Sequence, residues 1–152
     1  MEQCGMGFVS DYFSAPSDEA AARVIGIDVD LREPPYDVLQ IKNIIPGYHL
    51  APVEVFLAGR SAEAVKENPR NGMLLAEAGD QEVVVLTVSD EFTASLAGAS
   101  GERLAEAAES WSHFEDFQGT DTSGLAGFLG DLASLARRAR ARNERLYCYL
   151  GI

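Results

Sequence analysis

The C-terminal part of the chain has the clearest pattern of hydrophobic and polar positions. Apolar residues recur there at intervals of three and four, which is typical of a helix with one face against a core. These residues are Leu125, Phe128, Leu129, Leu132, Leu135, Ala136 and Ala139. A cluster of arginines and then the apolar run Leu146 to Ile152 complete the chain. The pattern predicts a long amphipathic helix from Asp121 that leads through the arginines into a closing strand.

Several other segments have the alternation or the β-branched and aromatic content of strands. Gly7 to Phe13 and Tyr36 to Ile41 each end in residues that favour turns. Residues 73–76 and 82–88 predict a β-hairpin, and its second arm is apolar on both faces, as in a strand that is covered on both sides. Val24 to Leu31 also alternates, which predicts a half-exposed strand, although the same residues fit an irregular loop.

Helix starts are indicated by serines followed by acidic residues, because a hydroxyl caps free amides and acids favour the positive end of a helix. Ser17, Ser61 and Ser89 are followed in this way and predict three helices. Leu50 to Leu57 has helical spacing of its apolar positions, and Gly101 to Trp111 predicts a further helix.

Together these elements predict one α+β domain over residues 1–152. The strands at the N-terminus, in the hairpin and at the C-terminus are expected to share one mixed sheet, with Leu146–Ile152 paired to Gly7–Phe13. Several helices, including the long C-terminal one, are expected to pack on this sheet. Strand order is left open, and neither a repeat nor a linker divides the chain.

Composition and charge favour a globular protein and disfavour membrane and nucleic-acid-binding proteins. The chain has 152 residues, of which 47% are hydrophobic, and this is ordinary for a globular protein. Its apolar runs are shorter than the roughly 20 residues of a membrane span, and its N-terminus lacks the order of a secretion signal. We therefore expect a cytoplasmic protein that is not membrane-bound. A formal charge of −12 disfavours nucleic-acid binding and is compatible with a basic protein partner, although it also serves solubility.

One group of polar residues suggests a site between the last two helices. It consists of Glu109, Trp111, His113, Glu115 and Asp116. An imidazole between carboxylates can act as a general base or share a divalent metal with them. The alternative is a structural loop that is anchored by aromatic side chains, which is the more economical interpretation because a metal site usually needs three or four ligands.

Two further candidate sites involve residues near the chain ends. Asp11 beside Tyr12 lies in an otherwise apolar strand, so a buried acid there would need a partner, for which a C-terminal arginine is a candidate. Arg138 and Arg145 belong to an arginine cluster that could bind phosphate or a carboxylate ligand. The same arginines could instead stabilise the end of the helix and pair with the acidic surface.

The remaining signals are weaker or absent. Asp28 and Asp30 could form a carboxylate pair, but alternation alone places acids on a solvent face. Cys148 is expected to be a small core residue. The sequence contains no phosphate-binding loop, dinucleotide fingerprint, nucleophile elbow or paired-cysteine metal motif, so no cofactor, metal or catalytic residue is predicted.

The two ends of the chain and one central junction resemble a known family. The resemblance rests on Met6 to Phe13 followed by Ser17 to Glu19, on Thr87 to Glu91, and on the closing Asn143 to Tyr149. These segments are similar to small actinobacterial proteins without an assigned activity and, more distantly, to the YfbM-like family of unknown function. The resemblance implies a single α+β domain and no transferable catalytic residue. It also implies that Met6 corresponds to the family's start and that residues 1–5 are an unstructured extension.

These observations favour a non-enzymatic protein-binding domain of a regulatory or immunity-like kind, whose acidic surface meets a basic protein. The alternative is a small-molecule or metal-dependent enzyme that uses His113 with neighbouring carboxylates, or an arginine anion site. A concave pocket that His113, Asp11, Tyr12 or the arginines line would favour the second hypothesis.

Overall fold

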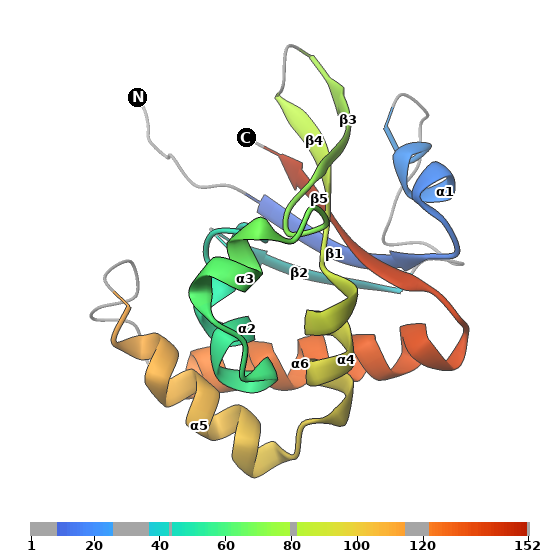
Figure 1. Cartoon of the computed structure of the whole chain (residues 1–152). Helices are drawn as coiled ribbons and strands as arrows, with labels where there is room; N and C mark the ends of the chain where they lie inside the picture. Colours follow the sequence, from blue (N-terminus) through green and yellow to red (C-terminus); the bar gives the residue numbers. More distant parts are fainter. Residues whose placement is uncertain (1–8, 26–36, 43, 80–81, 115–121, 152) are drawn as a thin grey trace.

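The computed structural model describes residues 9–25, 37–42, 44–79, 82–114 and 122–151 (Figure 1). The described strands are β1 (Val9–Ala15), β2 (Val38–Lys42), β3 (Leu74–Ala78), β4 (Val83–Thr87) and β5 (Arg145–Gly151). The described helices are α1 (Asp18–Ala22), α2 (Ala51–Ala58), α3 (Ala62–Glu67), α4 (Asp90–Gly98), α5 (Gly101–Ser112) and α6 (Thr122–Ala141). The predicted α+β class is confirmed.

The described strands form one sheet in the order β2-β1-β5-β4-β3. The last strand of the chain is thus the middle strand, with β1 on one side and β4 on the other. The predicted pairing between the N- and C-terminal strands is confirmed, since Tyr12 is in register with Cys148. The sheet is not mixed as expected, because every neighbouring pair of described strands is antiparallel.

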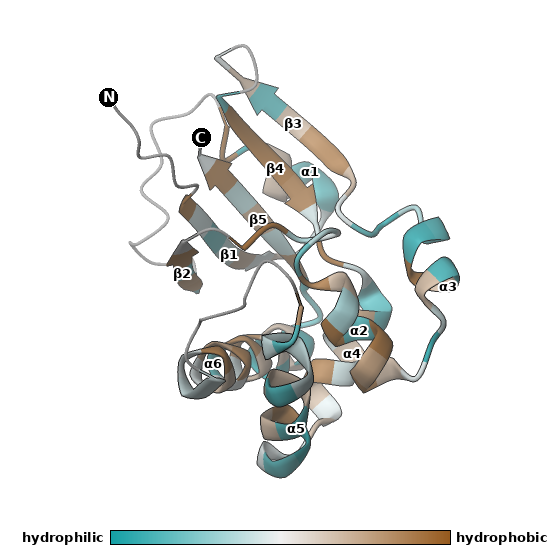
Figure 2. Ribbon diagram, turned by 90° about the vertical axis from the view of Figure 1, so that its left-hand side faces the viewer, coloured by the Kyte–Doolittle hydropathy of each residue, from teal (hydrophilic) through white to brown (hydrophobic). Residues whose placement is uncertain are grey.

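The two faces of the sheet bury different sets of side chains, because successive residues of a strand point to opposite sides. Tyr12, Cys148 and Val84 face the larger core, which they share with helices α2, α4, α5 and α6. Phe13 and Tyr147 face a smaller core together with Val85 and residues of α1 and the turn that follows it. Figure 2 shows β4 as hydrophobic along nearly its whole length. The prediction that this strand is covered on both sides is therefore confirmed.

The long helix α6 has the buried face that its periodicity predicts. The predicted inward residues are all buried, from Leu125 to Ala139. The predicted caps are also present, since the hydroxyls of Ser17, Ser61 and Ser89 each accept a hydrogen bond from an amide three residues later. Cys148 is fully buried, as expected of a small core residue.

Some predictions lie outside the described residues. Most of the strand expected over Val24–Leu31, including Asp28 and Asp30, falls on residues 26–36. Residues 1–5, to which the family resemblance assigns no structure, also lie outside.

Candidate functional site

Among the described residues of the predicted site around His113, His113 and Glu109 have exposed side chains. His113 follows α5 directly, and its side chain is 76% exposed. Its Nε2 lies 3.5 Å from Oε1 of Glu109, whose side chain is exposed as well. Trp111 points the other way into the core, where its indole N–H donates to the carbonyl of His49 at 2.9 Å. Glu115 and Asp116 lie outside the described residues.

The strand residues Asp11 and Tyr12 do not form a site with the arginines. Tyr12 is fully buried, its hydroxyl donates to the carbonyl of Ile44 at 2.8 Å, and burial raises its pKa well above the ordinary value. Asp11 is partly exposed and accepts a hydrogen bond from Gln40 Nε2 at 2.8 Å. The idea of a buried acid that needs an arginine is therefore wrong, because the partner is a neighbouring β2 side chain.

Several of the C-terminal arginines have partners inside the molecule. Arg138 makes a two-point contact with Asp37, through Nε at 2.5 Å and Nη2 at 3.0 Å, and this contact holds the pKa of Asp37 below its ordinary value. Arg145 Nε lies 3.4 Å from Asp90 Oδ1. Arg137 donates to the carbonyls of Ala97 and Ala99 at the end of α4. These contacts favour a structural role for the cluster over an anion site.

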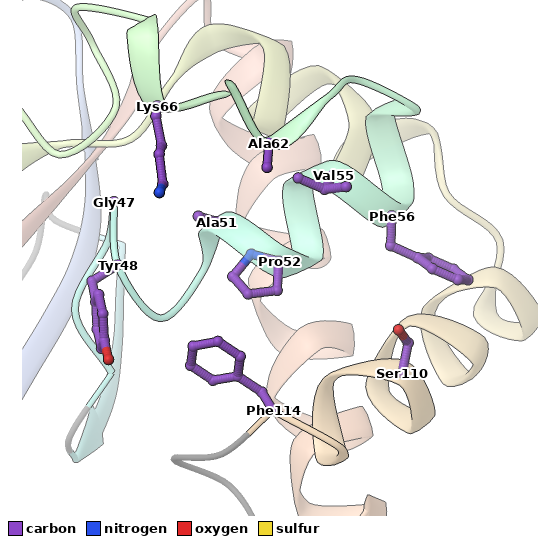
Figure 3. Close-up of a pocket in the computed structure, with 10 residues that line it drawn as sticks. All are labelled: Gly47, Tyr48, Ala51, Pro52, Val55, Phe56, Ala62, Lys66, Ser110 and Phe114. Carbon is purple, nitrogen blue, oxygen red and sulfur yellow. The ribbon is translucent and has the colours of Figure 1, made fainter. Parts of the chain in front are cut away.

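A cleft that the sequence did not suggest lies between α2, α3 and the end of α5. Its volume is about 560 Å³. Most of its lining is apolar and consists of Ala51, Pro52, Val55, Phe56, Ala62 and Phe114. Figure 3 shows Lys66 projecting from α3 into this space, with Tyr48 and Ser110 at its margins. Tyr48 is 56% exposed, so its ring adds accessible apolar surface to the margin of the cleft.

The wall that carries Tyr48 is a turn held in place by close backbone packing. Gly47 and Gly72 both have positive φ angles, +87° and +68°. A Cβ on Gly72 would lie only 2.8 Å from the carbonyl oxygen of Pro46, so glycine is required for the two turns to meet. The Tyr48 ring then packs edge-on against Phe114, with 6.1 Å between ring centroids. The aromatic side of the cleft is therefore fixed by residues far apart in the sequence.

The opposite wall is helix α2, whose ends follow local rules. Pro52 lies in the first turn, where its missing amide proton costs nothing, and Gly59 ends the helix in the left-handed conformation at φ +67°. With α2 placed in this way, Pro52, Val55 and Phe56 face the cleft while Val53 is buried in the core.

A second hollow of about 580 Å³ adjoins the cleft and shares Phe56 and Ser110 with it. Its lining includes three exposed carboxylates of α5, from Glu102, Glu106 and Glu109. Arg103 also lines this second hollow, with its guanidinium carbon 4.2 Å from the centroid of the Phe56 ring and Nη2 donating to the Phe56 carbonyl at 2.9 Å. The apolar cleft therefore passes directly into an acidic surface.

One carboxylate on α2, the helix that forms a wall of the cleft, is buried. The side chain of Glu54 on α2 is only 2% exposed, and its Oε1 accepts a hydrogen bond from the Ser89 hydroxyl at 3.0 Å. Oε2 lies 3.7 Å from Nη1 of Arg60. Burial raises the pKa of Glu54, although the Ser89 hydrogen bond and the charge of Arg60 act in the opposite direction. The sequence carries a signal for this inward position of Glu54. Glu54 lies four residues after Leu50 and three before Leu57, and therefore on the same face of the helix as these apolar residues.

On the other face of the sheet, Asp18 joins three elements. Arg70 Nη1 and Nη2 each donate to its carboxylate at 2.9 Å, and the Tyr147 hydroxyl donates at 2.7 Å. These contacts, with the Arg70 hydrogen bonds first, lower the pKa of Asp18 from 3.8 to about 2. The network connects α1 to the loop before β3 and to the central strand β5.

Replacing Asp18 with Asn should lower stability by about 1 kcal/mol at pH 7, since partly exposed charged contacts contribute modestly. Because the folded-state pKa is depressed, the carboxylate stabilises fully above about pH 4, and this contribution is lost as the pH falls toward 2. Urea unfolding of Asp18→Asn at pH 7 and near pH 2 should therefore give a difference that shrinks in acid. Glu19→Gln, an exposed neighbour in the same helix, is the control. An undiminished difference near pH 2 would contradict the ionic origin.

The described residues contain no group of three or more His, Cys, Asp or Glu side chains that could hold a metal. Within the same residues, the helices are too short or too polar to cross a membrane. Comparison with models of protein families gives no match, and neither curated proteins nor solved structures give one. The resemblance to the YfbM-like family stays a prediction.

Proposed function

We propose that this chain is a cytoplasmic, non-enzymatic binding protein of a regulatory or immunity-like kind, which contacts a basic protein partner through the cleft between α2, α3 and α5. The observation that carries the proposal is the cleft itself. It is apolar and partly formed by the exposed ring of Tyr48, and it opens beside the carboxylates of α5. Exposed apolar surface with a polar rim is characteristic of protein interaction sites.

The polar groups of the cleft are arranged poorly for catalysis. Covalent catalysis usually needs a nucleophile beside a base, with both within hydrogen-bond reach. In Figure 3, Ser110 lies on the opposite side of the cleft from Lys66, and the ring of Pro52 lies between them. The cleft therefore offers apolar contact area with a few polar groups at its margin, which suits binding.

The alternative is a small-molecule or metal-dependent enzyme with a site near His113. The only support among the described residues is the His113–Glu109 pair, and both side chains are well exposed. Neither residue is among the described residues that line the apolar cleft, although Glu109 lines the second, more open hollow. Protein binding is favoured because it uses the apolar cleft, and the enzyme hypothesis does not.

The test is selection of peptides from a random phage-displayed library on the native protein, followed by measurement of peptide affinity by fluorescence anisotropy. Ala62 lines the cleft and is exposed, so Ala62→Trp should fill the cleft without disturbing the core. We expect selected peptides to bind this variant at least about tenfold more weakly, a loss of about 1.4 kcal/mol.

Ala141→Trp is the matched control, because Ala141 is exposed at the end of α6, which packs on the sheet and on α4 and α5. Selected peptides should bind it as tightly as they bind the native protein. Failure to enrich any peptide, or equal binding to Ala62→Trp, would overturn the proposal.

A further inference from the structure

We infer that the segment which occupies the cleft is a basic amphipathic helix of the partner protein. This inference rests on the proposed function and adds the chemistry and conformation of the partner. It follows from three features of the two adjoining hollows: the apolar lining of the first, the carboxylates of the second, and the scarcity of hydrogen-bonding groups in the first.

The first hollow requires apolar side chains from the partner. Its walls are formed by aliphatic and aromatic groups, and Tyr48 and Phe114 contribute ring edges on one side. Burial of apolar surface contributes roughly 25 cal/mol per Å², so leucine-like or aromatic side chains gain most by entering. A volume of about 560 Å³ is in the range of pockets that enclose a sizeable ligand group.

The second hollow selects positive charge beside those apolar groups. Glu102, Glu106 and Glu109 are spaced four and three apart, so their carboxylates form one stripe along α5. Arg103 is held by the Phe56 ring and carbonyl and lies 3.6 Å from Glu106, so it offsets only part of this charge. Lysines or arginines of the partner that lie over this stripe complement it and raise the association rate.

The backbone of the bound segment must satisfy its own hydrogen bonds. The side chains that line the first hollow offer only the polar groups of Tyr48, Lys66 and Ser110. Its described lining belongs to helices α2, α3 and α5, to the turn that carries Tyr48 and to Phe114 just after α5, and includes no residue of a β-strand. An extended peptide would therefore leave amides desolvated without partners, at about 1–3 kcal/mol each. A helix pairs these groups internally and presents apolar residues at i, i+3, i+4 and i+7 to a groove.

The test uses a fluorescein-labelled peptide of about 18 residues that is built from leucine and lysine with helical spacing, long enough to form a helix on binding. A peptide of the same composition with strictly alternating leucines is the control for conformation. Binding to the full-length protein is followed by fluorescence anisotropy. We expect the helical peptide to bind at least about tenfold more tightly than the alternating peptide.

Two sets of charge-removing variants test whether the helical peptide binds at the carboxylates of α5. The triple substitution Glu102→Gln, Glu106→Gln and Glu109→Gln should weaken binding of the helical peptide at least about fivefold, or about 1 kcal/mol. Ala62→Trp should weaken it too. The control triple Glu19→Gln, Glu77→Gln and Glu82→Gln removes the same charge from exposed positions on α1 and the β3–β4 hairpin. Its binding should match that of the native protein.

The outcomes separate this inference from the proposed function. Equal binding of the two peptides, or equal weakening by the two triple variants, would overturn the basic-helix partner. A further outcome is that the library peptides that bind are not basic helices and that Ala62→Trp abolishes their binding. In that case the proposed function stands without this inference. If neither library nor helical peptides depend on the cleft, both are wrong.

Discussion

A chain that ends at Arg145 should not fold. Deletion of residues 146–152 removes most of the central strand β5, which pairs with β1 on one side and β4 on the other. Leu146, Tyr147 and Cys148 are fully buried, and large apolar side chains each contribute about 1.5–3 kcal/mol when buried. Their loss, with two ladders of hydrogen bonds, is comparable to the 5–15 kcal/mol that typically stabilises a whole domain. We expect the truncated chain to lose its near-ultraviolet circular dichroism and its cooperative thermal transition.

A shorter deletion, of Gly151 and Ile152 alone, is the control, because it leaves the fully buried residues of β5 in place. That variant should melt cooperatively near the temperature of the native protein. A chain of residues 1–145 that still melts in one cooperative transition would show that β5 is not required to hold the sheet together.

The elements that were predicted correctly are those whose signal is local. The spacing from Leu125 to Ala139 specifies which face of α6 is buried, and all of these predicted positions are inside. The aromatic and β-branched content of β1 and the apolar run of β4 also indicate strands from local sequence alone. The pairing of β5 with β1 was predicted and is confirmed. The central position of β5 was not predicted, because strand order depends on pairing between distant segments.

The cleft could not be predicted, because it depends on contacts between distant segments. Tyr48 and Phe114 are far apart in the sequence, and they meet only when the turn at Gly47 packs against Gly72 and α5 packs against α2. The contacts of Arg137 could not be predicted either. Its hydrogen-bond acceptors are backbone carbonyls at the end of another helix, and every residue type has such a carbonyl. His113 was proposed as a site residue because histidine is a common catalytic and metal-binding residue. The structure places it on the surface, directly after α5.

Removal of the Arg60 side chain should destabilise the protein, and the loss of stability should depend on pH because Arg60 lies beside the buried Glu54. The Glu54 carboxylate is buried, and Arg60 is its cationic neighbour at 3.7 Å. In Arg60→Ala the buried charge loses this partner, and the loss should reach about 1–3 kcal/mol, below the cost of breaking a fully buried pair because Arg60 is partly exposed. Urea unfolding at pH 7.5 and pH 4.5, chosen as roughly above and near the ordinary carboxyl pKa, measures this difference.

The sign of the pH effect follows from the raised pKa of Glu54, which burial causes. A carboxyl whose folded-state pKa is raised costs stability as the pH rises above its ordinary pKa, and the cost is complete above the folded-state value. Without Arg60 the folded-state pKa rises further, so Arg60→Ala should lose more stability at pH 7.5 than at pH 4.5, because protonation of Glu54 at the lower pH relieves the cost of the buried charge. In a Glu54→Gln background the titrating group is absent, so the loss of stability caused by Arg60→Ala should be nearly the same at both pH values. Equal losses for Arg60→Ala at both values would mean that Arg60 acts through packing alone, and that its charge does not stabilise the Glu54 carboxylate.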